Sequence, residues 1–153
     1  MNDQYGSNKT IVFRDGHDTD VNARFSILSS GTPTNHTYQV EESTPAGYTT
    51  GGVHFYGLPN GEARGAVPVY RAYSSVNTDT MLTTDPAGEA GTMGAMGFGQ
   101  ADILFYAFLD ASDMISTLAE GEQAAPLYRY YSQSSQDHMY TLTPIGGTPI
   151  LAN

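Results

Sequence analysis

The chain has 153 residues, no cysteine and a formal net charge of −10, because six Lys and Arg stand against sixteen Asp and Glu. This length fits a single domain with one core. The negative charge disfavours nucleic acid and anionic membranes as partners, and the lack of cysteine excludes disulfides and thiolate metal sites. The sequence shows neither a secretory signal nor a membrane span, so we expect a cytoplasmic location, with secretion by another route and glycosylation at the sequons of Asn8 and Asn35 left open.

Taken in chain order, short segments rich in Tyr, Phe, Val and Thr alternate with Gly, Pro, Asn and Ser, a pattern typical of strands and turns. Residues 111–124 carry helix formers and predict a turn or two of helix. The expected strand segments are 10–13, 24–28, 35–39, 53–56, 68–74, 79–83, 103–106, 126–132 and 137–141.

These segments contain an internal repeat. Residues 68–74 (PVYRAYS) recur as 126–132 (PLYRYYS), and 79–83 (DTMLT) recur at the same spacing as 137–141 (DHMYT). The segment 35–39 (NHTYQ) is a third copy of the second block, and 24–28 (RFSIL) is the nearest match to the first. The sequence therefore predicts three copies of one unit.

A third block contains Gly-Tyr or Gly-Phe followed by a strand, at 47–56 and again at 97–106. Too few residues follow Tyr140 to supply another copy, but residues 5–13 have its spacing. We therefore expect the N-terminal strand to complete the third unit and to close a ring without an exposed sheet edge. This closure predicts that the two termini lie close together.

The predicted fold is an all-β, β-trefoil domain over residues 1–153 with pseudo-threefold symmetry and about four strands in each unit. The expected boundaries are 22–66 for unit one, 67–124 for unit two, and 125–153 together with 1–21 for unit three. A three-sided prism and a small propeller remain alternatives, although propellers more often have four to eight blades.

The blocks Tyr70-Arg71-x-Tyr73, DHMYT at 137–141 and Gly47-Tyr48 with a later Phe-Tyr pair resemble a Tyr-rich β repeat family of unassigned function. This resemblance implies a carbohydrate-binding accessory role. The size, the three units and the absence of cysteine are also similar to the lectin-like β-trefoil light subunit of mushroom tyrosinase, which implies a non-catalytic subunit of a fungal enzyme.

Candidate ligand residues are those that combine a polar acceptor, an imidazole and aromatic rings, as sugar hydroxyls and pyranose faces require. A structural interpretation competes with this one, in which Asp137 caps a turn and His138 and Tyr140 fill the core. The candidate ligand-binding residues are Asp137, His138, Tyr140, Asn35, His36, Tyr38 and Tyr131. Arg71 and Arg129 are expected to pair with carboxylates.

The sequence contains no nucleophile elbow, phosphate loop, dinucleotide fingerprint or zinc-binding histidine pair. We therefore expect no enzyme activity, no cofactor and no metal site. The expected function is a lectin-like carbohydrate-binding module whose partner is a glycan. The alternative is a non-catalytic lectin-like subunit docked on an enzyme such as a fungal tyrosinase, with sugar binding weak or lost.

Overall fold

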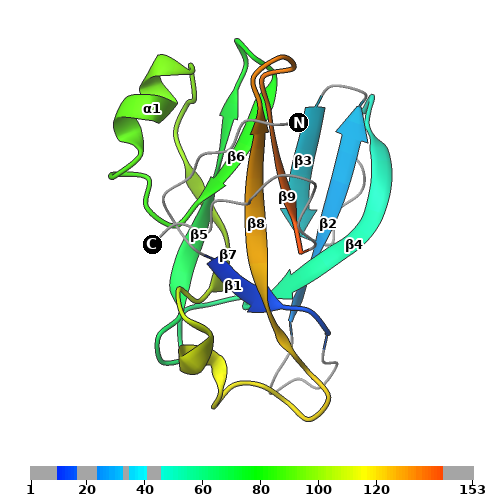
Figure 1. Ribbon diagram of the computed structural model, residues 1–153, viewed down its shortest axis with the longest axis vertical. Helices are drawn as coiled ribbons and strands as arrows, with labels where there is room; N and C mark the ends of the chain where they lie inside the picture. Colours follow the sequence, from blue (N-terminus) through cyan, green and yellow to red (C-terminus); the bar gives the residue numbers. More distant parts are fainter. Residues whose placement is uncertain (1–9, 17–23, 33–34, 41–45, 143–153) are drawn as a thin grey trace.

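The computed structural model describes residues 10–16, 24–32, 35–40 and 46–142, and this part of the chain is all-β with antiparallel sheets, as predicted (Figure 1). A short helix, α1 (Ala90–Ala95), and a 3-10 turn, η2 (Ala111–Met114), interrupt the strands. No helix in these residues is long and apolar enough to cross a membrane. The strands are β1 (Thr10–Phe13), β2 (Phe25–Thr32), β3 (Asn35–Val40), β4 (Thr49–Gly57), β5 (Val67–Ser74), β6 (Asp79–Thr83), β7 (Asp102–Ala107), β8 (Ala124–Ser132) and β9 (Asp137–Thr141).

The strands form three units with the same pairing. In each unit a hairpin is joined by a third strand, which pairs with the first strand of the hairpin: β2 with β3 and β4, β5 with β6 and β7, and β8 with β9 and β1. We call these units one, two and three. The turns of the hairpins of units two and three lie at the same end of the molecule, at the top of Figure 1.

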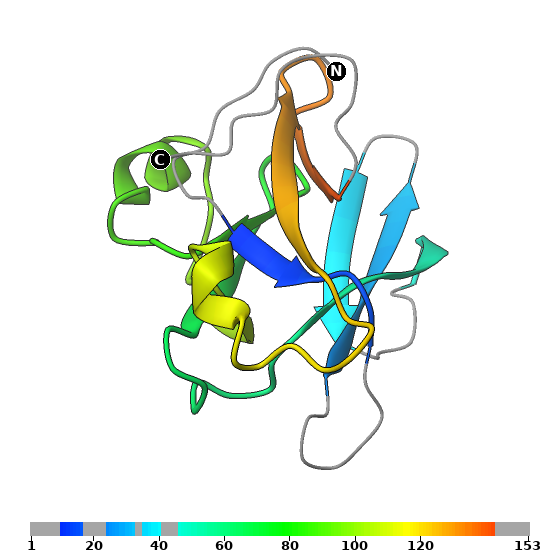
Figure 2. The same cartoon turned by 60° about the horizontal axis from the view of Figure 1, so that its bottom comes forward.

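The N-terminal strand lies where the repeat predicted it. β1 pairs with β8 from Thr10 opposite Leu127 to Phe13 opposite Ala124, and Figure 2 shows it beside β8 at the centre of the molecule. The first and last strands of the described chain therefore belong to one unit.

The hairpin register identifies equivalent residues in the three units. The last residue of the first strand pairs with the first residue of the second: Thr32 with Asn35, Ser74 with Asp79, and Ser132 with Asp137. Counting back along the first strands places Ser29, Arg71 and Arg129 at one equivalent position. The same count makes Gly31, Tyr73 and Tyr131 equivalent.

The third strands of the units contact one another in a cycle. Phe13 of β1 pairs with Tyr56 of β4. Leu58, directly after β4, pairs with Tyr106 of β7, and Phe108, directly after β7, pairs with Ile11 of β1. The last two pairs are each joined by two backbone hydrogen bonds of 2.7–3.0 Å. Each unit is thus bonded to both of the others at this level.

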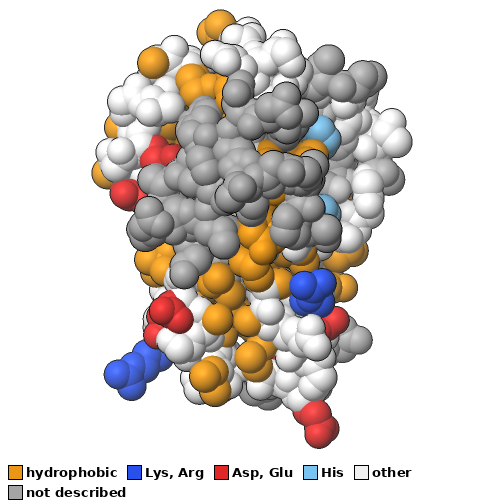
Figure 3. All heavy atoms as spheres, viewed as in Figure 1, with side chains coloured by type: hydrophobic (Ala, Val, Ile, Leu, Met, Phe, Trp, Pro, Cys, Tyr) orange, Lys and Arg blue, Asp and Glu red, His pale blue; other side chains and the backbone are white. Residues whose placement is uncertain are grey.

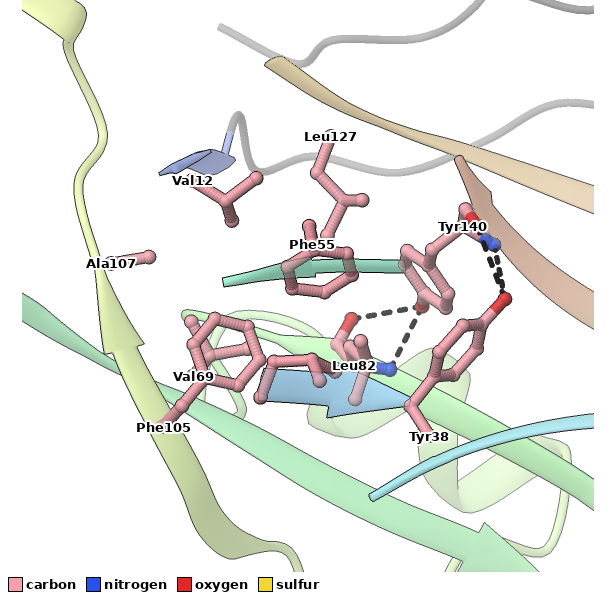
Figure 4. Close-up of a cluster of buried hydrophobic side chains, with 10 residues drawn as sticks. Val12, Tyr38, Phe55, Val69, Leu82, Phe105, Ala107, Leu127 and Tyr140 are labelled. Carbon is pink, nitrogen blue, oxygen red and sulfur yellow. Dashed lines mark hydrogen bonds between the residues drawn. The ribbon is translucent and has the colours of Figure 1, made fainter. Parts of the chain in front are cut away.

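A cluster of buried side chains from all three units fills the space between them (Figure 4). Equivalent positions contribute similar side chains, such as Ile27, Val69 and Leu127, all of which are buried. Gly57 of β4 is an exception to this similarity between equivalent positions. A Cβ atom at Gly57 would lie 2.3 Å from the Phe105 ring. Only glycine fits here, because the close packing of β4 against β7 leaves no room for a side chain.

The structure corrects four details. Each unit contributes three strands within the described residues, not four. Unit one aligns its first block through Leu28 and Ser29, not through Arg24 and Phe25. β1 is equivalent to β4 with a shift of two residues, because Phe13 corresponds to Leu58. Helix α1 was not predicted, whereas η2 begins the segment where a helical turn was expected. The expected proximity of the termini concerns residues outside those described.

Arg24 has a different role from the one its alignment implied. Its guanidinium donates to Glu122 Oε1 at 2.8 Å and to the Thr117 carbonyl at 2.7 Å, and it lies 4.0 Å from the centre of the Phe13 ring. The side chains of Arg24 and Glu122 are both 2% exposed. Arg24 therefore links the segment after η2 to β1 through these contacts.

Ile11→Pro tests whether the contact between β1 and β7 holds the fold together. The Ile11 N–H donates to the Phe108 carbonyl at 2.7 Å, and proline removes this donor. We expect the free energy of unfolding in urea to fall by about 1–3 kcal/mol, the cost of a buried unsatisfied carbonyl, while the Ile11→Val control stays close to wild type. Equal stability of the two variants would contradict the cyclic arrangement.

Candidate functional site

Neighbouring units are joined by a repeated carboxylate–imidazole pair. Asp79 of unit two accepts from the backbone N–H of His138 at 2.8 Å and lies 2.5 Å from its Nδ1. Asp137 of unit three contacts His36 of unit one in the same way, at 3.0 and 2.5 Å. Each carboxylate thus holds both the backbone and the ring of a histidine in the next unit.

The interface between units one and two has a neutral version of this pair. Asn35 stands in place of the aspartate and Thr80 in place of the histidine. Asn35 Nδ2 donates to the Tyr48 hydroxyl at 2.5 Å, and Tyr48 is equivalent to Phe98, which packs against His138 with ring centres 5.9 Å apart. A buried carboxylate without its imidazole would be costly. Where Thr80 replaces the histidine ring, Asn35 therefore replaces the charged aspartate, and Tyr48 supplies a hydroxyl that Phe98 lacks.

Tyrosine hydroxyls form a second set of bonds between units (Figure 4). The Tyr140 hydroxyl accepts from the Leu82 N–H at 2.8 Å and donates to the Leu82 carbonyl at 2.9 Å. The Tyr38 hydroxyl bridges the N–H and carbonyl of Tyr140 in the same way, at 2.8 and 3.2 Å. Burial raises the pKa of Tyr140 to about 12 and raises that of Tyr38 as well. Both phenols stay protonated and able to donate at neutral pH.

Arginines occupy a third equivalent position in units two and three. Arg129 donates to the Leu82 carbonyl at 2.8 Å and to both oxygens of Glu89 at 2.7 and 3.1 Å, which confirms its predicted pairing. Burial alone would raise the pKa of Glu89, but the bonds and charge of Arg129 outweigh it and lower that pKa. Arg71 donates to the Tyr38 carbonyl at 2.5 Å. In both interfaces a guanidinium thus binds a strand carbonyl of the preceding unit.

The interface between units one and three lacks this arginine, because Ser29 takes its position. The carbonyl that it would bind belongs to Tyr140, and His54 Nε2 bonds to that carbonyl instead at 2.7 Å. His54 lies in β4 where the pairing with β2 shifts register between Ile27 and Leu28. A bulge of this kind redirects a side chain. An imidazole from β4 thus replaces the guanidinium and leaves space beside Ser29.

A second small residue opens the same interface. Gly31 pairs with His36, whereas the equivalent Tyr131 pairs with His138 and covers its ring at 4.7 Å between centres. As a result the His138 side chain is fully buried, while that of His36 is 34% exposed. Gly31 therefore turns a buried carboxylate–imidazole pair into one that reaches the surface.

Together these replacements leave a pocket of about 350 Å³ between units one and three. His36 and His54 line the pocket, and Figure 3 shows histidine side chains at the surface of the molecule. The described lining residues are mostly small or hydroxyl-bearing, and none is Asp, Glu, Lys or Arg. They are Ser29, Ser30, Gly31, His36, Tyr38, Thr49, Gly51, His54, Met139, Tyr140 and Thr141.

The predicted ligand residues separate into two groups. His36, Tyr38 and Tyr140 line the pocket, and Asp137 holds the His36 ring from below the surface. The remaining candidates are buried in contacts between or within units: Asn35, His138 and Tyr131. The structural interpretation is confirmed in that His138 and Tyr140 fill the core, but Asp137 bonds to His36 rather than capping its own turn.

Sequence reasoning missed the pocket residues of β2 and β4. Ser29 and Gly31 were hidden by the misaligned first block of unit one, and His54 lies in the third repeated block opposite Leu104, where it was not taken as a ligand candidate. Once the hairpins are aligned by their Asn or Asp residue, the absence of Arg and Tyr at these two positions is visible in the sequence. Among the described residues, no group of three or more metal-binding side chains is found.

Within the described residues, the fold is a β module of three units in which the interface between units one and three is open. Residues 28–108 match the family described as a domain of unknown function, DUF5648, and the chain belongs to that family. The match runs from β2 of unit one to the end of unit two. Comparison with curated proteins and with solved structures found no match.

Converting the charged pair of Asp79 and His138 into the neutral combination of Asn and Thr tests whether the two residues act as a pair. Asp79→Asn and His138→Thr each leave a buried polar partner, so we expect each to lower the free energy of unfolding by about 1–3 kcal/mol. Together they reproduce the Asn35 and Thr80 combination, so the double variant should lose less than the two single losses combined. Urea denaturation measures all three.

Asp137→Asn serves as the control for this cycle. Its imidazole partner, His36, is partly exposed and can bond to water, so the cost should be smaller than that of Asp79→Asn. Additive losses in the double variant would show that Asp79 and His138 do not act as a pair.

Proposed function

We propose that this protein is a lectin-like, carbohydrate-binding module without catalytic activity, and that its sugar site is the pocket between units one and three. The observation that carries the proposal is the breaking of symmetry at Ser29 and Gly31. The equivalent interfaces have Arg and Tyr at these positions, whereas this one is open. The space that Arg and Tyr side chains fill in the other interfaces is therefore accessible to a ligand in this one.

The lining chemistry supports a sugar as ligand. Hydroxyls of Ser29, Thr49 and Thr141 and the rings of His36 and His54 surround the space, and such groups exchange hydrogen bonds with sugar hydroxyls. The volume of about 350 Å³ lies at the lower end of the range for small-ligand pockets. A monosaccharide unit is therefore a better match than an extended chain.

The same lining supports binding rather than hydrolysis. Glycoside hydrolysis ordinarily uses two carboxyl groups on either side of the scissile bond. The described lining residues include no Asp or Glu, and Asp137 is occupied by His36. The Asp137–His36 pair then serves to orient the ring toward a ligand.

The β-trefoil description belongs to this proposal. Three units with one pairing scheme, contacts between all three third strands, and an N-terminal strand in unit three support it. Three described strands in each unit resemble the layout of a small propeller as well. The proposed binding site depends on the interfaces between units and is the same in either description.

The second candidate is a non-catalytic subunit docked on an enzyme such as a fungal tyrosinase. Exposed apolar side chains favour it, since Val76 in the turn after β5 is 79% exposed and the neighbouring Tyr73 is 47% exposed. Recovery of an enzyme at stoichiometric ratio with the native chain, together with absence of glycan binding, would favour this candidate.

Closing the pocket tests the proposed sugar site. Ser29→Arg and Gly31→Tyr introduce the residues of the other two units, so we expect the fold to be kept and glycan affinity to fall by at least about tenfold, or ~1.4 kcal/mol. A glycan array identifies the ligand, and calorimetry on the wild type and both variants measures the loss.

Val76→Arg is the matched control, because it adds the same charge as Ser29→Arg at an exposed site outside the pocket. Its affinity should equal that of wild type. Glycan binding that survives both pocket substitutions with the fold intact would place the sugar site elsewhere.

A further inference from the structure

We propose that Asn60 is a site of spontaneous covalent modification, at which the side-chain amide closes onto the following backbone nitrogen and is then hydrolysed to aspartate and isoaspartate. Asn60 precedes Gly61 in the connection between β4 and β5, which joins unit one to unit two. The inference is independent of the carbohydrate pocket. It follows from the exposure of Asn60, from the hydrogen bond of its side chain, and from the contrast with the other asparagines in the described residues.

The reaction needs only the chain and water. Resonance makes a peptide nitrogen a poor nucleophile, so the Gly61 N–H first gives its proton to hydroxide. The nitrogen then forms a bond to Cγ of Asn60, and the Cγ–Nδ2 bond breaks as Nδ2 takes a proton from water and leaves as ammonia, which restores the hydroxide. Water finally adds to one of the two carbonyls of the succinimide ring. Opening at one carbonyl gives aspartate, and opening at the other gives isoaspartate, in which the chain runs through the side chain.

Gly61 leaves the attacking nitrogen open. Glycine has no Cβ atom that could shield its own N–H, and both Asn60 and Gly61 are exposed. Among the described residues, no backbone carbonyl outside the helices and strands accepts from the Gly61 N–H. Solvent therefore reaches the nucleophile and the amide that it attacks.

A hydrogen bond activates the Asn60 amide. Its Oδ1 accepts from the Glu62 N–H at 3.0 Å, the contact with the backbone two residues on that asparagine makes in turns. This bond folds the side chain along the peptide group of Gly61, which lies between the bonded residues in the chain. It also places a backbone N–H at the oxygen that becomes negative when Cγ is attacked, as an oxyanion hole does.

The other asparagines in the described residues lack this arrangement. Asn77 donates from Nδ2 to a backbone carbonyl at 3.1 Å, so the group that must leave is held. Asn77 also precedes Thr78, whose branched side chain crowds the attacking nitrogen. Asn35 is 4% exposed and lies in a strand. Asn60 alone of these three combines an open nucleophile with a polarised carbonyl, and Asn77 serves as the internal reference.

Incubation of the full chain in mildly alkaline buffer, followed by peptide mass spectrometry, tests the inference. We expect Asn60 to lose its amide at least about tenfold faster than Asn77, with isoaspartate among the products. Gly61→Ala should slow the reaction at Asn60, and so should Glu62→Pro, which removes the N–H that bonds to Oδ1. Glu62→Gln keeps that N–H and is the matched control, with the rate of wild type. An unchanged rate at Asn77 shows that each variant keeps its fold.

Four results would each overturn the inference. The first is an amide loss at Asn60 no faster than at Asn77. The second is an equal rate in Glu62→Pro and Glu62→Gln, which would mean that the backbone N–H does not assist. The third is a faster reaction in urea than in the folded chain, which would mean that the turn protects Asn60. The fourth is aspartate without isoaspartate, the product of direct hydrolysis rather than closure onto Gly61.

Discussion

The fold depends on side chains of one unit that form hydrogen bonds with the backbone of a neighbouring unit. β3, β6 and β9 lie at the ends of their sheets, where unpaired backbone groups must find other partners. The Tyr38 and Tyr140 hydroxyls and the guanidiniums of Arg71 and Arg129 supply those partners. Side-chain hydrogen bonds across the core thus replace a backbone ladder between the hairpins.

Because these bonds come from equivalent positions of the units, a change at one of them alters one interface and leaves the others intact. The interface of units one and two has Asn35 and Thr80 in place of a charged pair, and the Thr80 hydroxyl donates to the Thr37 hydroxyl across it at 3.2 Å. The interface of units one and three lost an arginine and a covering tyrosine and stayed open, with His54 taking over the strand carbonyl. Symmetry supplies the scaffold, and its local loss at Ser29 and Gly31 produces the candidate site.

The repeat made much of this accessible from the sequence. The DHMYT and YRYY blocks predicted the hairpins, and the missing last block predicted the partner of β1, because a repeated unit needs all of its strands. The site was harder to predict. His36, Tyr38 and Tyr140 were found by their chemistry, but the Asp137-His138 pair differs from Asn35-His36 only in the residue before the histidine. An imidazole is covered when the residue opposite it in the hairpin is Tyr131 and exposed when that residue is Gly31. Identifying the opposite residue requires the register of the hairpin strands.

The histidine rings provide the most direct test of the central claim, which is that only the open interface binds a ligand. Ring ¹H–¹⁵N spectra of the full chain, assigned with single substitutions and followed during titration with a sugar that the glycan array identifies, separate His36, His54 and His138. The account predicts that the His36 and His54 signals shift together to saturation while those of His138, which is 0% exposed, stay in place. Equal shifts at His138, or none at His36 and His54 while the sugar binds, would contradict it.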